Sequence, residues 1–365
     1  MRSLNYKIIN LMNFSEKTNT IYFINGRYLH QRITGVQRYA REVIHCFGGN
    51  KVSILSPEID ILKRGPFWEQ VILPSYFKNH SILWSPTNTG PLAISRQVVT
   101  IHDLSTIDHP EWFSKPFALW YRFLLPHLAK RVHRVITDSQ FSKNRILACF
   151  QIPEKKVKVI YPGVGEKFRP STDIEINRVR SKYKLASIYI LAVGSLEPRK
   201  NLLRLLDAYE RMRGQYPKME LVIVGSSGYP FKDPHLDSLP KGTHLLSEIP
   251  DTDLPSIYSG AQFFVYPSIY EGFGLPILEA MACGTPVIAS NATSIPEVVG
   301  EAGMLFDPFN VDAIATGMEK VINDPDLQNH LTELGLQRAK LFTWDRTAQQ
   351  VWELLVQALE ETQYD

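Results

Sequence analysis

The sequence predicts an α/β protein with two domains, each built on a doubly wound parallel sheet. Two observations lead to this prediction. Short apolar runs bounded by turn residues alternate with helical patterns along the 365 residues, which is typical of parallel strands joined by crossover helices. A chain of this length also exceeds the size at which a single hydrophobic core usually stops growing, so two domains are expected.

The first domain is predicted from six apolar runs that read as buried strands. They are residues 20–25, 51–55, 81–86, 97–103, 134–139 and 156–163. A polar stretch follows, which places the domain boundary at about residues 165–187. We therefore assign residues 1–170 to an N-terminal domain.

The second domain, residues 186–342, repeats the pattern with six further runs. These are YILAVGS, MELVIVGS, THLLSEI, AQFFVYPS, TPVIAS and GMLFDP. A final helix at about residues 343–365 carries Trp344, Val351, Trp352, Leu355 and Leu359 at helical spacing. This helix needs an apolar surface to lie on, and packing back on the N-terminal domain is one way to provide it.

The composition excludes several classes of protein. With 44% hydrophobic and 21% charged residues, the chain is typical of a soluble globular protein. No apolar run reaches the length of a signal-peptide core or the ~18 residues of a membrane span, so we expect a cytoplasmic protein. The three cysteines, Cys46, Cys149 and Cys283, are widely spaced and have no nearby histidine, so they are expected to be small core residues rather than disulfide or zinc ligands.

The charge is divided unevenly along the chain. Residues 1–170 hold 24 Lys and Arg against 11 Asp and Glu, a balance of +13, while the remainder holds 16 against 26, or −10. A basic N-terminal half predicts an anionic partner, either acidic membrane lipid at the inner face of the membrane or a phosphate-bearing acceptor. Attraction between two oppositely charged domains is an equally weighted alternative. We expect no nucleic acid partner.

One segment of the second domain has the pattern of an anion site. A buried strand leads into a loop with Gly272 and Gly274, and a helix opens near Leu275. The positive end of a helix dipole favours a phosphate at such a position. Glu279, one turn into the helix, is suited to accept hydrogen bonds from ribose hydroxyls, and Glu271 from the hydroxyls of a sugar. The alternative is an ordinary turn with two solvated glutamates.

A second loop of the same domain supplies positive charge. Arg199 and Lys200 follow the run YILAVGS and precede an amphipathic helical pattern. Two adjacent cations between a strand and a helix are suited to a diphosphate, because charge-assisted hydrogen bonds are the strong ones. The alternative is a solvated cap of a surface helix.

These motifs resemble the retaining glycosyltransferases of family 4, which have the GT-B architecture. The resemblance is carried by GVQRYAREV, VVTIHDLS, VITDSQFSKNRI, VGSLEPRKN and YEGFGLPILEAMACGTPVIAS, and it spans nearly the whole chain. It implies two facing Rossmann-like domains with the active site in the cleft between them. The N-terminal domain would bind the acceptor and the C-terminal domain a nucleotide-sugar donor.

The resemblance also implies roles for individual residues. Arg199 and Lys200 match the basic residues that bind the diphosphate, Glu271 the glutamate beside the donor sugar, and Glu279 the one that holds the ribose. His102 matches an active-site histidine near the donor sugar. A neutral imidazole there could hydrogen-bond a sugar hydroxyl or the reacting centre, and the usual pKa of histidine leaves either protonation state available. The catalytic residues expected on this basis are His102, Glu271, Lys200 and Arg199, and Asp103 beside His102 remains a second candidate for the reacting centre.

Further donor contacts follow from the same resemblance. Many members have an arginine where this sequence has Ser195, and Arg199 is the residue expected to take its place. Ile249 could border the nucleotide base. The full set expected to bind the donor is Gly35, Ser195, Arg199, Lys200, Ile249, Glu271, Gly272, Phe273, Gly274, Leu275 and Glu279.

No metal and no other cofactor is expected. The side chains of Arg199 and Lys200, with the helix after Gly274, can neutralise a departing diphosphate by preorganised charge. The sequence 251–253 does spell the D-x-D pattern of metal-dependent glycosyltransferases, but either aspartate as the N-cap of the helix that follows is the favoured interpretation.

The predicted function is transfer of a hexosyl unit, with retention, from a UDP-glucose-type donor to a hydroxyl of a polysaccharide or lipid-linked oligosaccharide, leaving UDP. GDP-mannose as donor is the first alternative. A nucleotide-sugar epimerase of the same architecture and a nucleotide-binding protein without activity are others. Residues 111–134, aromatic and then basic, are predicted to form a core helix, with membrane or lipid-linked acceptor docking as the alternative.

Overall fold

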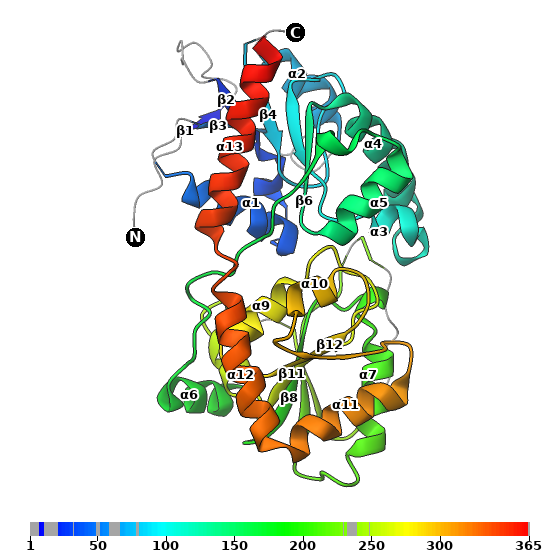
Figure 1. The fold of residues 1–365 in the computed structure, drawn as a ribbon, viewed down its shortest axis with the longest axis vertical. Helices are drawn as coiled ribbons and strands as arrows, with labels where there is room; N and C mark the ends of the chain where they lie inside the picture. The colour runs from blue at the N-terminus through cyan, green and yellow to red at the C-terminus, as the bar shows by residue number, and fades with distance from the viewer. Residues whose placement is uncertain are drawn as a thin grey trace. The chain divides into compact units, whose positions relative to one another are not determined.

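The structure, a computed structural model, describes residues 7–10, 21–31, 33–48, 52–57, 66–77, 80–228, 230–231, 239–247 and 249–363. The chain forms two compact units (Figure 1). Unit 1 comprises residues 1–107, 119–163 and 344–365, and unit 2 comprises residues 108–118 and 164–343.

Unit 1 is built on a parallel sheet in the order β1-β3-β2-β4-β5-β6-β7. Its central strands β4, β5 and β6 are buried along almost their whole length, which is why their sequences are nearly continuous apolar runs. Strand β1 lies outside every predicted run. The strands are β1 (Lys7–Asn10), β2 (Tyr22–Asn25), β3 (Val52–Ser56), β4 (Ile82–Ser85), β5 (Gln97–Thr100), β6 (Arg134–Thr137) and β7 (Val157–Val159).

Helices cover the sheet of unit 1. The longer ones are α1 (Gly35–Cys46), α4 (Lys115–Arg131), α5 (Gln140–Phe150) and α13 (Trp344–Gln363). The first turn of α4 belongs to unit 2, and the rest of that helix belongs to unit 1. Short helices complete the set: η2 (Gly26–His30), η4 (Trp68–Ile72), α2 (Leu73–Ser75), α3 (Ser105–Asp108), η5 (Pro110–Trp112) and η6 (Glu154–Lys156).

The last helix, α13, lies along α1 in unit 1 (Figure 1). Its Trp352 ring packs on Tyr22 and Phe47, with ring centroids 4.6 and 5.6 Å away. Leu355, on the same face, is 2% exposed. The C-terminal helix therefore buries its apolar face on the unit that holds the N-terminal strands.

Unit 2 is built on a second parallel sheet, in the order β10-β9-β8-β11-β12-β13. Apolar side chains pack on both of its faces. The strands are β8 (Tyr189–Val193), β9 (Glu220–Val224), β10 (Thr243–Leu246), β11 (Phe263–Tyr266), β12 (Val287–Ser290) and β13 (Met304–Phe306). The helices are α6 (Asp173–Tyr183), η7 (Pro198–Lys200), α7 (Leu202–Met212), α8 (Leu254–Ser259), α9 (Leu275–Ala282), α10 (Ile295–Val299), α11 (Val311–Asn323) and α12 (Pro325–Ala339). Two parallel sheets with covering helices confirm the predicted fold class.

The surface differs from the sequence-based expectation in two places. None of the three cysteines forms a disulfide, but only Cys283 is buried as expected of a core residue. Cys46 is half-buried, and Cys149 is exposed on α5. Helix α4 buries Leu124, Leu125 and Leu128, yet it leaves Leu119 and Phe123 exposed. No helix in the described part of the chain has the length and apolar character needed to cross a membrane.

Candidate functional site

The loop after β8 brings two cations to the carboxyl end of the unit 2 sheet. It passes through Gly194 and turns through η7, which holds Arg199 and Lys200. Gly194 and Gly225 allow this tight passage, because a Cβ on Gly225 would lie 1.8 Å from the Gly194 carbonyl oxygen. Lys200 crosses back over Gly194, so its ammonium is buried near the end of β11.

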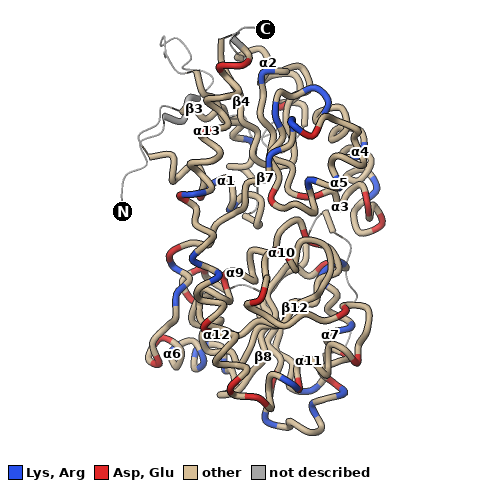
Figure 2. Tube along the Cα trace, in the orientation of Figure 1, with Lys and Arg blue, Asp and Glu red and all other residues tan. Residues whose placement is uncertain are grey.

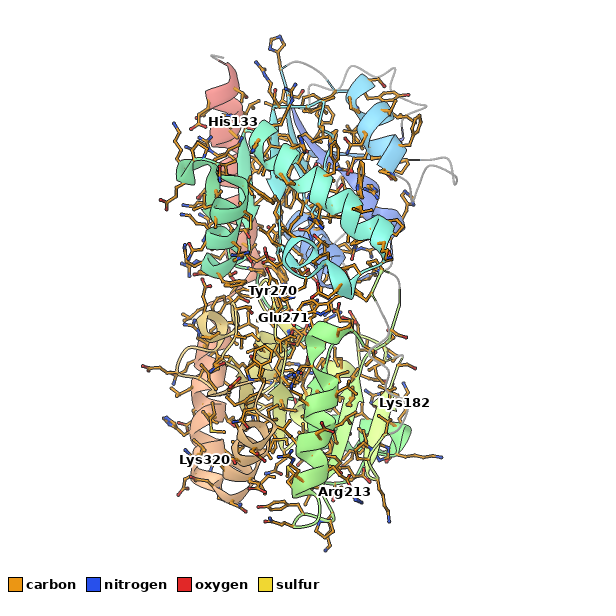
Figure 3. The ribbon with its side chains drawn as sticks, turned by 90° about the vertical axis from the view of Figure 1, so that its right-hand side faces the viewer. His133, Lys182, Arg213, Tyr270, Glu271 and Lys320 are labelled. Carbon is orange, nitrogen blue, oxygen red and sulfur yellow. The ribbon has the colours of Figure 1, made fainter. Side chains whose placement is uncertain are left out.

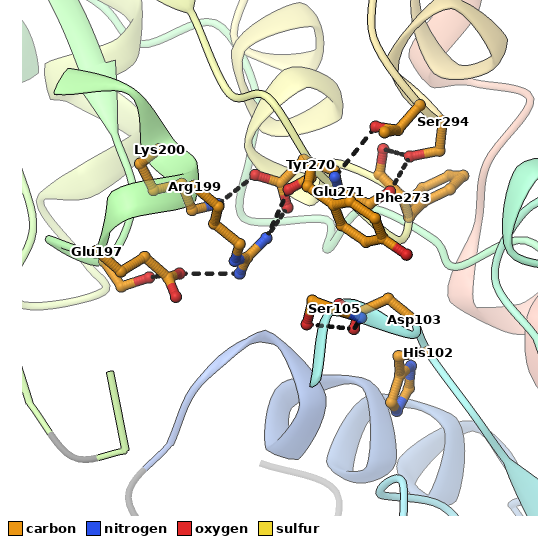
Figure 4. A network of polar contacts seen from close by, with 12 residues as sticks. His102, Asp103, Ser105, Glu197, Arg199, Lys200, Tyr270, Glu271, Phe273 and Ser294 are labelled. Carbon is orange, nitrogen blue, oxygen red and sulfur yellow. Dashed lines mark hydrogen bonds and ion pairs between the residues drawn. The ribbon is translucent and has the colours of Figure 1, made fainter. Parts of the chain in front are cut away.

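Both cations bind Glu271 (Figure 4). Lys200 Nζ donates to Glu271 Oε1 at 2.5 Å, and Tyr266 Oη donates to the same oxygen at 2.7 Å. Arg199 donates to Oε2 and also contacts Glu197 at 2.9 Å. The result is a buried chain of alternating charges, from Glu197 through Arg199 and Glu271 to Lys200.

This network fixes the charge of its members. Burial acts to raise the pKa of Glu271, but Arg199 and Lys200 outweigh it and lower that pKa to about 2. Burial, reinforced by the neighbouring charge of Arg199, lowers the pKa of Lys200, which Glu271 and Glu197 partly oppose. Glu271 is therefore a carboxylate at any pH near neutrality.

The loop that carries Glu271 is held by hydroxyls of the segment before α10. The Glu271 amide donates to Thr293 Oγ1 at 3.1 Å, and Ser294 Oγ donates to the carbonyls of Glu271 and Phe273 at 2.9 and 3.0 Å (Figure 4). Gly274 then adopts φ +119°, a conformation that L side chains rarely adopt, and α9 begins at the next residue. The predicted strand, glycine loop and helix are thus all present.

Other predicted donor residues of unit 2 lie in different surroundings. Glu279 is buried on α9 and accepts a hydrogen bond from Tyr258 Oη at 3.0 Å. Ser195 donates to Glu197, and Ile249 is half-buried against the core of unit 2. Leu275 is the first residue of α9, and Gly272 lies in the loop before it.

His102 follows β5 in unit 1 and is buried among protein partners. Its Nδ1 lies 2.6 Å from Asp138 Oδ2, and its Nε2 lies 2.9 Å from the Pro86 carbonyl oxygen. The Pro86 carbonyl is an acceptor, and the Asp138 carboxylate is a second one, so these contacts favour an imidazole that is protonated on both nitrogens. Burial acts to lower the pKa of His102, but Asp138 and the Pro86 carbonyl outweigh it and the pKa is raised. In this structure both ring nitrogens are therefore taken by protein partners, and the predicted role of His102 beside the donor sugar stays a prediction.

Two more predicted residues belong to unit 1. Asp103, next to His102, accepts hydrogen bonds from the amide and hydroxyl of Ser105, the first residue of α3, at 2.9 and 2.7 Å (Figure 4). Gly35 is the first residue of α1. Before it, the Thr34 amide donates to Gln37 Oε1 at 3.0 Å, an interaction that fixes this end of the helix.

The D-x-D segment has a structural role. Asp253 directly precedes α8 as expected, but its side chain does not cap that helix; it is buried and accepts from Arg178, Lys182 and Tyr183 at 2.8, 2.6 and 2.7 Å. Asp251 binds Lys167 at 2.6 Å instead. Within the described residues, no three His, Cys, Asp or Glu side chains are grouped so as to hold a metal ion.

Some polar groups of these networks were not predicted from the sequence. Glu197 lies in VGSLEPRKN and Asp138 in VITDSQFSKNRI, two of the motifs that carry the family resemblance. Their position in these motifs could have indicated a place in the networks. Tyr266 ends a strand that was predicted as buried, and its hydroxyl at the strand end was the clue. Thr293 carries no local signal, because only the fold brings it to Glu271.

Comparison with known proteins agrees with these motifs. Residues 173–338 match the family described as "Glycosyl transferases group 1", and residues 80–167 match "Glycosyltransferase Family 4". Over 270 residues the chain is 37% identical to the O-antigen chain mannosyltransferase B of Escherichia coli, covering 71% of this chain and 70% of that protein. The chain belongs to glycosyltransferase family 4. The resemblance inferred from the motifs is confirmed.

A longer relative and a solved structure extend the comparison. The glycosyltransferase is 28% identical over 332 residues to the serotype-specific mannosyltransferase WbdA of Escherichia coli. The aligned region is 88% of this chain but only 40% of the length of WbdA. The sucrose-phosphate synthase of Thermosynechococcus elongatus has a TM-score of 0.74 at 20% identity, with 93% of this chain and 99% of that one covered. The fold is GT-B, as the resemblance implied.

Proposed function

We propose that this glycosyltransferase transfers a mannosyl unit from GDP-mannose to a hydroxyl of a growing glycan chain. The observation that carries the proposal is that its 37% identical relative is an O-antigen chain mannosyltransferase, and WbdA is also a mannosyltransferase. The expectation of UDP-glucose rested only on how common such donors are in the family. The relatives therefore favour GDP-mannose, the first alternative, over UDP-glucose.

Arg199 and Lys200 are proposed to bind the donor diphosphate. Their geometry supports this role, because Glu271 holds both cations in place and no side chain has to be reoriented when charge develops on the leaving group. The positive end of α9, which begins after Gly274, adds to the same field. With this charge supplied by the protein, we propose that transfer requires no metal ion.

Glu271 is proposed to bind a hydroxyl of the transferred sugar. Each carboxylate oxygen can accept about two hydrogen bonds. Oε1 already accepts from Lys200 and Tyr266, whereas the described side chains supply Oε2 with Arg199 alone. A sugar hydroxyl therefore has a position at Oε2.

The same contacts argue against Glu271 as a covalent nucleophile. A carboxylate that two cations and a phenol bind is stabilised as it stands and has little tendency to attack carbon. We propose instead that the leaving diphosphate oxygen takes the proton of the acceptor hydroxyl as that hydroxyl attacks the anomeric carbon from the same face. The bond to the diphosphate breaks as the glycosidic bond forms, so the configuration is retained.

His102 is proposed to act through position and charge rather than through proton transfer. Asp138 and the Pro86 carbonyl occupy both of its ring nitrogens. The imidazolium fixes the backbone that follows β5, where Asp103 accepts a hydrogen bond from the first residue of α3, and it places a buried positive charge at the carboxyl end of this sheet.

A donor panel tests the proposal. Purified protein is incubated with GDP-mannose, UDP-glucose, UDP-galactose or GDP-fucose and a mannose-terminated oligosaccharide, and glycan products are separated by chromatography. GDP-mannose should give extended product, and Glu271→Ala, unlike the exposed Glu210→Ala, should not. Product formed only from a UDP-sugar would contradict the proposed donor, and donor loss without any extended glycan would contradict transfer.

A further inference from the structure

A basic pocket opens on unit 1 at the edge of the sheet opposite to His102. It has a volume of about 400 Å³, within the usual size of small-molecule sites. Its walls come from the residues that precede three neighbouring parallel strands: 95–96 before β5, 131–133 before β6, and 153–156 before β7. His102 and Asp138 follow the carboxyl ends of β5 and β6, so the length of a strand, roughly 13 Å, separates them from this pocket.

Positive side chains dominate the pocket lining. The permanent cations are Arg96, Arg131, Arg134, Lys155 and Lys156, and His133 lies among them. Glu361 of α13 is an acidic side chain that hydrogen-bonds to this lining. Figure 2 shows blue positions beside β7, and Figure 3 labels His133 next to α13.

Hydrogen bonds hold part of this lining in place. Glu361 Oε2 accepts from His133 Nε2 at 2.7 Å and from Arg134. Lys156 Nζ donates to the Lys130 carbonyl oxygen at 2.6 Å. Burial and the charge of Arg134 lower the pKa of Lys156, which indicates that the cations repel one another when no anion is present.

Two of the cations have no such anchor. Arg131, at the end of α4, and Lys155, in η6, are exposed and are not held by any carboxylate in the described part of the chain. Glu154, next to Lys155, pairs with Lys143 at 2.8 Å instead. Two exposed cations and three half-buried ones match the several oxygens of a phosphate group, which charge-assisted hydrogen bonds recognise best.

We propose that this pocket binds a phosphate-bearing anion, with Arg131 and Lys155 closing on the ligand over Arg96, Arg134 and Lys156. The site is separate from the donor site of unit 2 and does not depend on the proposed function. The same chemistry is offered by a free polyphosphate and by the headgroup of an anionic phospholipid, and the experiment distinguishes these two sources.

The probe is inorganic pyrophosphate, titrated calorimetrically into the full chain with and without excess GDP. GDP occupies the donor site if the proposed function is correct, so binding that persists in its presence reports the pocket. Arg131→Gln combined with Lys155→Gln should weaken this binding at least about tenfold. The matched control, Arg122→Gln with Lys158→Gln, removes two exposed cations of unit 1 outside the pocket and should leave it unchanged.

The proposal of an anion site would be overturned if the two double variants bound pyrophosphate with equal affinity, or if the unmodified protein did not bind it in the presence of GDP. A failure of GDP itself to bind would count against the proposed function alone, because the two double variants can still be compared without it. Cosedimentation with phosphatidylglycerol and phosphatidylcholine vesicles identifies the source. If the ligand is a lipid headgroup, Arg131→Gln with Lys155→Gln should lose binding to phosphatidylglycerol vesicles and the control should not. If the ligand is a free anion, the two double variants should bind vesicles equally.

Discussion

At the scale of single residues, charge state follows from the partners that the fold supplies. Glu271 and His102 are both buried, and burial alone would favour the neutral form of each. Two cations keep Glu271 ionised, and Asp138 favours the protonated form of His102. In both cases the charged form is favoured for the same reason, a partner of opposite sign within hydrogen-bond distance.

Removing a member of the Glu271 network should be costly for transfer. We expect Glu271→Ala and Lys200→Ala each to lower the transfer rate at least about a hundredfold, because one preorganised electrostatic contact usually contributes that much. Initial rates with GDP-mannose measure the effect, and thermal melts check that each variant folds. Near-native rates in both variants would contradict the assigned roles, and Glu210→Ala, an exposed carboxylate on α7, serves as the control.

The Asp138 contact to His102 should make stability depend on pH in a defined direction. The pKa of His102 is raised from 6.5 on folding, so its contribution is fully present below 6.5 and is lost as pH rises through the folded-state value. Asp138→Asn should therefore lower the melting temperature more at pH 6 than at pH 9. A cost that is equal at both pH values, or larger at pH 9, would contradict a protonated His102. Glu353→Gln, on the exposed side of α13, should show no such dependence.

At the scale of elements, loops and helix ends are fixed by contacts from distant parts of the chain. Gly274 directly precedes α9, and Ser294 holds the loop that leads to it. Asp253 directly precedes α8, but its side chain binds α6 through Arg178, Lys182 and Tyr183. Asp253 thus joins α8 to α6. The local pattern, which predicts only an N-cap, does not indicate this contact.

The two aspartates of the D-x-D segment should differ in their effect on stability. Asp253→Ala is expected to lower the free energy of unfolding by about 2 to 3 kcal/mol, because three donors lose a buried partner, although Arg178 and Lys182 are half exposed and regain water. Asp251→Ala, at a side chain that is 57% exposed, should cost less than about 0.5 kcal/mol. Urea unfolding measures the free energy of unfolding of both variants. Equal losses would contradict the role of Asp253 as the buried partner of Arg178, Lys182 and Tyr183.

Acid should weaken the contacts of Asp253 with Arg178, Lys182 and Tyr183. The pKa of Asp253 is lowered to about 2 by its hydrogen bonds to Lys182, Tyr183 and Arg178, which outweigh burial. Its contribution to stability is therefore present above the ordinary value of 3.8 and is lost as pH falls through that range toward 2. The stability difference between Asp253→Ala and the unmodified protein should shrink over this range.

At the scale of the whole molecule, the chain crosses four times between its units. Residues 164–343 form most of unit 2, and α13 then returns to α1 and β4 of unit 1. The stability of unit 1 thus depends on the last helix of the chain as well as on its first strands. A basic pocket on unit 1 also depends on α13, because Glu361 holds His133 and Arg134.

Loosening α13 should destabilise unit 1. Leu355→Ala, at a side chain 2% exposed, is expected to cost about 2 to 5 kcal/mol, the usual range for a buried leucine. Glu353→Ala, on the exposed side of the same helix, should cost less than about 0.5 kcal/mol. Hydrogen exchange should show the loss of protection in α1 and β4. Unchanged protection there would contradict the dependence of unit 1 on α13.

The sequence by itself determined the α/β class, the central strands and the loops that carry Arg199, Lys200 and Glu271, because these features depend on local apolar patterns and on motifs that lie close together in the chain. Tertiary structure decided how those residues are charged and paired. Tyr266 and Ser294 reach Glu271, Asp138 and Pro86 enclose His102, and residues before three strands form the basic pocket. These contacts join positions far apart in the chain, so no local pattern encodes them.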